Sequence, residues 1–306
     1  MLHGWIVLDK PVGLGSTQAV SAIKRLLREA GEPRTRVGHG GTLDPLASGV
    51  LPIALGEATK VAGRMLDATK QYAFTIRFGE ETDTLDAEGK VVATSDVVPT
   101  AAQVADVLRR FTGEIEQVPP AYSALKIGGK ASYLRARAGE EVEPKPRTVT
   151  VHDLQLISDS ANEASLLATV SKGTYVRSLA RDIAHALGAV GHVSYLRRTR
   201  AGPFSLEHSV SLDFLEELAK ARQLTRAVLP LEAALDDIPA LPVTSRQAEL
   251  LRHGQRLAGI PAPGSHQSIT LAGSPSGLCL ATLEGTPVAL VEATADGLKV
   301  VRGFNL

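Results

Sequence analysis

The stretch from Gly38 to Gly49 constrains this chain more than any other part of its sequence. It reads Gly-His-Gly-Gly-Thr-Leu-Asp-Pro-Leu-Ala-Ser-Gly and runs directly into the apolar segment 50–55. Glycine permits backbone conformations that other residues resist, and proline stiffens the residues around Asp44. The pattern predicts a loop that holds one carboxylate, Asp44, beside a buried strand. A solvated turn aspartate before proline is the simpler interpretation of this stretch alone.

Size and composition suit a protein with one large and one small domain. The 306 residues are 44% hydrophobic, and 33 basic residues balance 33 acidic ones. Neutrality argues against a nucleic-acid binder that works through basic tails, but it permits a local basic face. Cys279 is the only cysteine, which excludes an internal disulfide and a cysteine-based metal site. We find no signal-peptide pattern and no apolar run long enough to span a membrane, so we expect a cytoplasmic protein.

Alternating strands and helices with polar loops between them predict an α/β or α+β sheet protein. Amphipathic spacing predicts one helix that starts at a Ser16 or Thr17 cap and stops at Gly31, and a second over 175–187. Alternation of apolar and polar residues predicts a strand at 72–78 with one buried face. We also predict strands at 5–8, 148–157 and 165–171, and helices at 59–68 and 100–111.

Residues 117–147 differ from their surroundings because they combine several prolines and glycines with basic residues. We predict that they form a mobile, basic excursion from the sheet. The composition changes again near residue 238, and beyond it we predict a short helix (246–252) and strands at 278–283, 288–292 and 298–302. The predicted domains are therefore 1–237 and a small β domain of the barrel type, 238–306.

Two further segments carry side chains suited to chemistry. Residues 171–177 join a strand end to a helix start, where free backbone N–H groups favour anions. Arg177, in the first helical turn, could pair with a carboxylate and keep it ionised. Residues 172–200 hold six Lys or Arg and a single acid, which suggests phosphate contacts. A solvated basic face would give the same pattern.

Taken together and in this order, these segments resemble the TruB family of tRNA pseudouridine-55 synthases. The matching pieces are 8–13, 38–49, 56–60, 70–72, 82–86, 120–126, 171–177 and 195–198. The resemblance extends from residue 4 to about residue 235. It implies an α+β pseudouridine-synthase fold: a mixed, largely antiparallel sheet with flanking helices and a central cleft. It also implies that 238–306 form a PUA-like, RNA-binding domain.

The resemblance implies roles for individual residues. Asp44 matches the essential aspartate, expected to be the nucleophile, and Arg177 matches the arginine that pairs with it. Tyr72 matches the active-site tyrosine that stacks on the target base. By itself, Tyr72 is more typical of an aromatic residue on a half-buried strand. Tyr175 and Leu196 match residues that line the uracil pocket.

A second set of matches concerns RNA binding. His39 matches the histidine that enters the T loop and helps to extrude the target, although by itself it is typical of a polar loop. Residues 117–147 match the loop that clamps the RNA. The expected RNA-binding set also includes Lys126, Lys130, Arg197 and Arg198. Lys10 and Lys60 belong to it as well, although they match positions that are either structural or close to the RNA.

The implied reaction converts uridine to pseudouridine at position 55 in the T loop of tRNA, with no cofactor and no metal. We expect a monomer that binds the T arm and needs neither a protein partner nor a membrane. Asp44 could attack the sugar C1′ or abstract a ribose proton, and the sequence does not choose between the routes. The alternatives are a subunit of an RNA-guided complex, an RNA chaperone and a glycoside hydrolase. The last normally needs two acids in register, and the sequence offers one convincing candidate.

Overall fold

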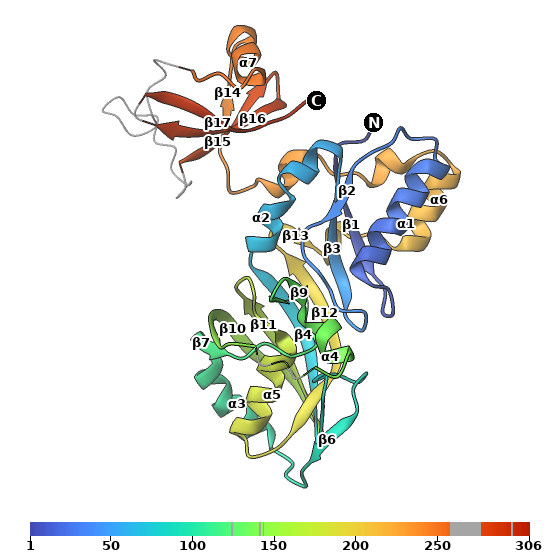
Figure 1. The fold of residues 1–306 in the computed structure, drawn as a ribbon, viewed down its shortest axis with the longest axis vertical. Coiled ribbons are helices and arrows are strands. Elements are labelled where there is room, and N and C mark those ends of the chain that lie inside the picture. Colours follow the sequence, from blue (N-terminus) through green and yellow to red (C-terminus); the bar gives the residue numbers. More distant parts are fainter. Residues whose placement is uncertain (124, 141, 143, 258–276, 295) are drawn as a thin grey trace.

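The structure is a computed structural model that describes residues 1–306 except 124, 141, 143, 258–276 and 295. For residues 126, 127 and 131 it describes the backbone and not the side chain. Two sheets dominate the described part: a nine-stranded sheet and, near the C-terminus, a four-stranded one (Figure 1). Among the described residues, no helix is both long enough and apolar enough to cross a membrane.

The large sheet is mixed and largely antiparallel, which confirms the predicted fold class. Its strand order is β1-β3-β12-β4-β11-β10-β7, with β2 paired to β3 and β13 paired to β12. Within this sheet, β12 and β3 pair in parallel and the other described pairs are antiparallel. The strands are β1 (Gly4–Lys10), β2 (Val37–His39), β3 (Ser48–Leu55), β4 (Lys70–Phe78), β7 (Gly113–Gln117), β10 (Arg147–Ser160), β11 (Glu163–Val170), β12 (Gly191–Ala201) and β13 (Phe204–Ser205).

The parallel junction between β3 and β12 depends on a glycine. Gly49 pairs with Lys10 on one side and with Arg198 on the other. Its φ is +100°, and a Cβ atom there would lie 2.2 Å from the carbonyl oxygen of Arg198. Only glycine fits this position without displacing a strand. The junction places the end of the loop that carries Asp44 directly against β12.

Helices pack on the large sheet in two groups (Figure 1). α1 (Ser16–Glu29) and α6 (Leu212–Lys220) share a core with β1 and β3. α3 (Ala101–Val107) and α5 (Val176–Ala186) share a second core with β4, β10 and β11. The helix predicted at 59–68 is divided into a 3-10 turn (Gly56–Lys60) and α2 (Ala62–Asp67). The one predicted at 100–111 consists of α3 and a 3-10 turn (Leu108–Phe111).

The predicted cap of α1 was wrong. Gly15 is the N-cap, and its backbone N–H donates to the Gln18 side chain over 2.7 Å. The hydroxyl of Ser16 is buried, accepts from the backbone N–H of Leu43 (2.8 Å) and donates to the Leu43 carbonyl (3.0 Å). The Ser16 hydroxyl therefore binds the backbone of Leu43, which is distant in the sequence, and does not cap the helix as the local pattern predicted.

The excursion at 117–147, hereafter the insertion, has secondary structure of its own. It contains β8 (Lys126–Ile127), β9 (Lys130–Ala131) and α4 (Ser132–Arg137), and β8 pairs with β9. A second hairpin, β5 (Glu80–Thr82) with β6 (Val91–Thr94), precedes it in the chain. Figure 1 shows the insertion lying across β12 and β4.

The small sheet contains β14 (Ala240–Pro242), β15 (Leu278–Leu283), β16 (Thr286–Thr294) and β17 (Gly297–Gly303), with α7 (Ser245–Arg252). The three predicted strands and the helix are present, whereas β14 was not predicted. Leu280, Leu290 and Phe304 belong to the same buried cluster as Trp5 of the large sheet. Apolar packing therefore holds the two sheets together.

Candidate active site

A pocket of about 350 Å³ opens where the loop before β3 meets β4, β12 and the start of α5. Six residues singled out in the sequence line it: Asp44, Tyr72, Tyr175, Arg177, Leu196 and Arg198. They come from distant parts of the chain, and folding brings them around one space. Its volume is within the range that accommodates a small organic group.

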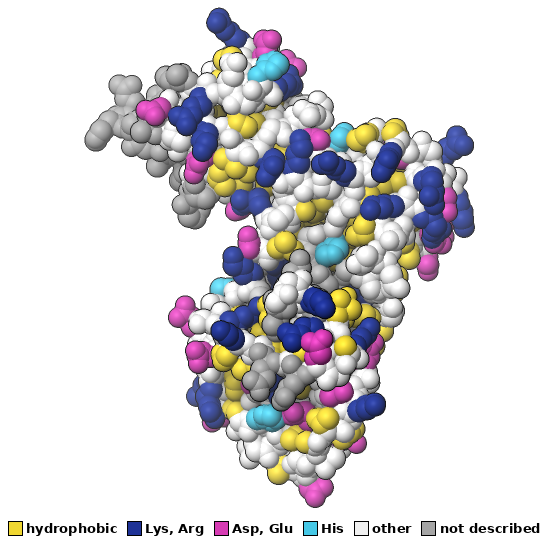
Figure 2. Space-filling model, viewed as in Figure 1, with side chains coloured by type: hydrophobic (Ala, Val, Ile, Leu, Met, Phe, Trp, Pro, Cys, Tyr) yellow, Lys and Arg dark blue, Asp and Glu magenta, His cyan; other side chains and the backbone are white. Residues whose placement is uncertain are grey.

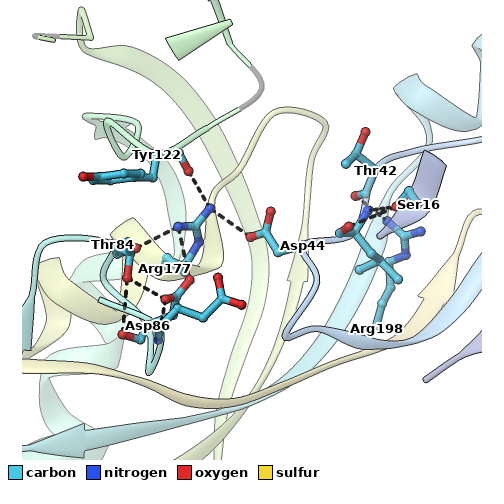
Figure 3. Close-up of polar contacts among 10 residues, drawn as sticks. Ser16, Thr42, Asp44, Thr84, Asp86, Tyr122, Arg177 and Arg198 are labelled. Atoms are coloured by element: carbon cyan, nitrogen blue, oxygen red, sulfur yellow. Dashed lines mark hydrogen bonds and ion pairs between the residues drawn. The ribbon is translucent and has the colours of Figure 1, made fainter. Parts of the chain in front are cut away.

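The carboxylate of Asp44 is paired with the guanidinium of Arg177 (Figure 3). Oδ2 of Asp44 lies 2.9 Å from Nη2 of Arg177. The Arg177 side chain is 6% exposed, whereas that of Asp44 is 39% exposed. The buried guanidinium therefore orients the carboxylate, which remains accessible to a ligand in the pocket.

Arg177 also binds three groups that the sequence did not connect with it. Its Nη1 lies 3.3 Å from Oδ2 of Asp86 and donates to the Thr84 carbonyl over 2.7 Å. Its Nη2 donates to the Tyr122 carbonyl over 2.9 Å (Figure 3). The guanidinium thus joins the Asp44 loop, the turn after β5 and the insertion.

Asp86 is the functional candidate that the sequence reasoning missed. Its side chain is 10% exposed, accepts from the Thr84 hydroxyl (2.6 Å) and accepts from the backbone N–H of Glu88 (3.1 Å). Its local sequence is typical of a turn aspartate, and the sequence analysis used residues 82–86 only as one of the segments that match the family. The signal that marks it is its ion pair with Arg177, which exists only in the folded chain.

The loop that carries Asp44 is held by buried groups on its flanks. Arg198, 1% exposed, donates to the carbonyls of Gly41 (3.1 Å), Thr42 (3.4 Å) and Val50 (2.7 Å). Ser16 binds both backbone groups of Leu43 (Figure 3). Backbone polar groups satisfied in this way hold the loop in one conformation.

Lys10 and Arg198 are buried, which disagrees with the expected RNA contact of Arg198 and fits the structural one of the two roles expected for Lys10. Lys10 is 0% exposed, and its Nζ donates to the carbonyls of Pro11 (2.9 Å), Leu14 (2.6 Å) and Pro45 (3.3 Å). Burial lowers the pKa of Lys10 to about 8, against the raising effect of Asp44. A buried cation is stable here because carbonyl oxygens solvate it. Both side chains therefore brace the loop from inside the protein.

Tyr72 and Leu196 come from neighbouring strands. On β4 and β12, Tyr72 pairs with Arg198 and Leu196 pairs with Phe74. Both side chains are partly buried and pack against the two cores that flank the centre of the sheet. Their remaining surface faces the pocket. An aromatic ring and a leucine on adjacent strands form an apolar wall opposite the charged pair.

The remaining RNA-binding candidates have different surroundings. Lys60 is paired with Glu57 (2.6 Å) and donates to the Gly303 carbonyl (2.9 Å), so it links the two sheets. Arg197 donates to Asp9 over 2.7 Å. Lys130 is exposed on β9, and the side chain of Lys126 lies outside the described part. These contacts leave Lys130 the most open of the described members of the set.

His39 ends β2, two residues before the braced part of the loop. It is half-buried, and its Nδ1 accepts from the backbone N–H of Gly41 over 3.4 Å. Burial, and then the positive charge of Arg198, lower the pKa of His39. The imidazole is therefore predominantly neutral at neutral pH.

Lys70 lines the pocket, although the sequence analysis gave it no role. It is 7% exposed, donates to the carbonyls of Leu66 and Ala68 (2.6 Å each), and has its pKa lowered to about 8, chiefly by burial. Among the described residues no group of three or more His, Cys, Asp or Glu side chains is placed to hold a metal ion. The chemistry that this pocket offers is that of one accessible carboxylate beside an aromatic wall.

A second hollow, a groove of about 1070 Å³, lies beside α1 and the loop that follows it. Five basic side chains line it, with two acidic ones: Lys24, Arg28, Arg34, Arg36 and Lys60, with Glu32 and Glu57. Figure 2 shows Lys and Arg gathered over this half of the molecule and over the insertion. Local basic faces thus exist on a chain with no net charge.

Sequence comparison finds family matches over most of the chain. The model described as "TruB family pseudouridylate synthase (N terminal domain)" matches residues 24–176. The model described as "tRNA pseudouridylate synthase B C-terminal domain" matches residues 177–236. A protein named tRNA pseudouridine synthase B from Zymomonas mobilis is 58% identical over 304 residues, covering 99% of this chain and 96% of its own length. One of the same name from Novosphingobium aromaticivorans is 56% identical over 311 residues, covering 100% and 98%.

Structural comparison finds similar folds in chains that belong to larger complexes. A chain in the structure of an H/ACA RNP bound to a substrate RNA containing 2′-deoxyuridine matches with a TM-score of 0.73 and 26% identity, over 99% of this chain and 86% of that one. A chain of a Cbf5-Nop10-Gar1 complex matches with a TM-score of 0.71 and 28% identity, over 99% and 84%.

Proposed function

The chain belongs to the TruB family of pseudouridine synthases, and from that premise we propose that it isomerises uridine 55 in the T loop of tRNA to pseudouridine. The resemblance read from the sequence is thereby confirmed at the level of the family. The enzyme is an isomerase that acts on tRNA.

The reaction requires few chemical groups. The N1–C1′ glycosidic bond breaks, the uracil turns over, and C5 forms a new bond to C1′. C5 then loses its proton and N1 gains one, so the product is an isomer of the substrate. No electron acceptor or phosphate donor takes part. We assign Asp44 as the group that acts at the sugar, either by attack on C1′ or by abstraction of a ribose proton. Each route needs an accessible carboxylate in a fixed orientation.

The ion pair between Asp44 and Arg177 inside the pocket carries this proposal. A 2.9 Å contact fixes the carboxylate, and its 39% exposure leaves an oxygen free for the nucleoside. We assign Tyr72 to stack on the target base, with Tyr175 and Leu196 as the other walls of the uracil pocket. Taking a base out of its stack costs a few kcal/mol, which stacking on an aromatic ring offsets.

We assign RNA binding to the exposed basic residues. Lys130 and the insertion would grip the T arm through its phosphates, which positions the RNA without reading its sequence. We propose that His39 enters the T loop, and that the groove lined by Arg34 and Arg36 contacts a further part of the tRNA. Lys60 and Arg197 would contribute charge near these surfaces. We propose that 1–237 form the catalytic domain and 238–306 a PUA-like domain that binds RNA.

We further propose that the enzyme works as a monomer without a protein partner, in the cytoplasm, where tRNA is found. The structural relatives that belong to larger assemblies make an RNA-guided subunit the alternative. Free tRNA as substrate is favoured by the 58% identity to a protein named as a tRNA enzyme, against 26–28% to those relatives.

The test is incubation of the purified protein with an unmodified tRNA transcript and with a bare T-arm hairpin. Pseudouridine is then mapped chemically at single-nucleotide resolution. We expect modification at one position in both RNAs, without added protein, guide RNA or metal. The variant Asp44→Asn should bind both RNAs and modify neither. Modification of the transcript only in the presence of a guide RNA would favour the alternative, and wild-type turnover by Asp44→Asn would remove Asp44 from its role.

A further inference from the structure

Both ends of the insertion contact a single residue of the pocket. Gln117 is the last residue of β7 and Arg147 is the first residue of β10, and the two are direct partners in the β7–β10 ladder. The insertion therefore leaves the sheet and returns to it at one pair of residues. Each member of this pair contacts Tyr175.

Gln117 holds the backbone of Tyr175. Its Nε2 donates to the Tyr175 carbonyl over 3.1 Å, and its Oε1 accepts from the Tyr175 N–H over 2.8 Å. Gln117 is 1% exposed, so these bonds are shielded from water. Tyr175 is the N-cap of α5, which carries Arg177 two residues later. The carboxamide thus fixes the point at which the pocket loop becomes the helix.

Arg147 holds the side chain of Tyr175. Its guanidinium lies over the Tyr175 ring, 4.7 Å from the ring centre, and its Nη2 donates to the Gly173 carbonyl. A planar guanidinium can stack and donate hydrogen bonds at once, which an ammonium group cannot. The ring is therefore held from the side of the insertion, and its remaining surface lines the pocket.

Three more bonds tie the first part of the insertion to α5. Ser178 donates to the Val118 carbonyl over 2.8 Å, Arg181 donates to the same oxygen over 3.3 Å, and Arg177 donates to the Tyr122 carbonyl over 2.9 Å. A displacement of the insertion would therefore also displace α5 and the pocket residues that it carries, because these hydrogen bonds connect them.

We propose that Gln117 and Arg147 are positioning residues that make the geometry of the uracil pocket depend on how the insertion is seated. When RNA fixes the insertion, this pair fixes Tyr175, and the base is then held in line with Asp44. The inference rests on the proposed function, because it assigns the pocket to uracil and the insertion to RNA. Neither residue needs to touch the RNA for this role.

The experiment measures single-turnover conversion of a T-arm hairpin, and separately the Kd of that hairpin, for Arg147→Met, Arg147→Lys and Gln117→Glu. Gln117→Glu keeps the acceptor for the Tyr175 N–H and loses the donor to its carbonyl. We expect the rate at saturating RNA to fall at least about tenfold in each variant, because small misplacements of reacting groups are costly. The Kd should stay within about threefold of wild type, since binding and chemistry are separate readouts.

Arg147→Lys separates positioning from charge. A rate as low as that of Arg147→Met supports the proposal, because lysine retains the charge but not the planar stack. A wild-type rate in Arg147→Lys, or a raised Kd with an unchanged rate in Arg147→Met, would overturn it in favour of a phosphate contact. The matched control is Arg109→Met, which removes the same charge from a side chain that is 86% exposed on the same half of the molecule. It should change neither quantity.

A double-mutant cycle tests whether the effect passes through Tyr175. In a Tyr175→Leu background, Arg147→Met should slow the reaction no further, because the ring that it holds is gone. Additive losses would contradict the proposal, as would unchanged rates in the single variants. Failure of the proposed function would look different: the unsubstituted protein would then form no pseudouridine in the hairpin.

Discussion

Asp44 and Asp86 bind the same guanidinium, but replacing Asp86 by asparagine should cost more stability, whereas replacing Asp44 should cost more activity. The Asp86 side chain is 10% exposed and that of Asp44 is 39% exposed, while Arg177 is 6% exposed. Removing one partner of a buried ion pair costs about 3–5 kcal/mol. Because Arg177 keeps one carboxylate and two carbonyls, we expect the free energy of unfolding to fall by about 2–3 kcal/mol in Asp86→Asn. For Asp44→Asn we expect a loss of about 1 kcal/mol or less, since an exposed pair is worth little.

Calorimetric melting and single-turnover kinetics measure the two effects. For a domain of this size, 1 kcal/mol shifts Tm by about 2–4 °C, so Asp86→Asn should lower Tm by roughly 4–12 °C and Asp44→Asn by at most about 4 °C. Conversion can be followed as tritium released from C5-labelled uridine. Asp44→Asn should be slower by at least about 10³-fold, and Asp86→Asn by about 10–100-fold. If Asp44→Asn melted lower than Asp86→Asn, or if Asp86→Asn melted like wild type, the reasoning from burial would be refuted.

Three further outcomes follow from the packing around the site. Gly49→Ala should yield insoluble protein or lose about 3 kcal/mol or more of stability in urea titrations. The reason is that the added methyl group would lie 2.2 Å from the Arg198 carbonyl oxygen. A soluble variant with wild-type stability would contradict this prediction. Burial lowers the pKa of Lys10 and of Lys70 from 10.5 to about 8, so between these values the unfolded chain binds more protons and stability should rise as the pH rises. Urea unfolding at pH 8 and at pH 10 measures this increase in stability, which should be smaller in Lys70→Met than in wild type. An equal increase in both proteins would mean that Lys70 keeps its ordinary pKa. Trp5→Phe should lower the free energy of unfolding by about 2–3 kcal/mol, measured by thermal unfolding. The indole is fully buried, and its N–H donates over 3.0 Å to a backbone carbonyl. A loss below about 0.5 kcal/mol would show that neighbouring side chains fill the space that the indole leaves.

Elements with a strong local period were predictable from the sequence. α1 and α5 each bury one face, and their ends lie within one or two residues of the predicted ones. The alternation at 72–78 marked β4 in the same way. In these segments the spacing of apolar residues records which side faces the core, so neighbouring residues suffice.

Segments whose burial depends on distant partners were not predictable. β12 lies inside the large sheet, yet the sequence predicted no strand there and marked this segment only by its basic residues and its family match. The side chain that misleads is Arg198, which is fully buried because three backbone carbonyls of the Asp44 loop and β3 accept its hydrogen bonds. A local pattern places arginine on the surface, since it contains no information about acceptors elsewhere in the chain.

The sequence alone determined the family, the α+β class and the candidate set around Asp44, because motifs, composition and periodicity are properties of adjacent residues. Tertiary structure alone decided which cations face solvent and which face carbonyl oxygens, and that Arg177 binds Asp86 as well as Asp44. The physical reason is that burial of a charge is tolerated only where opposite charges or carbonyl oxygens surround it in space. Those groups come from β3, the turn after β5 and the insertion, and only the folded chain brings them together.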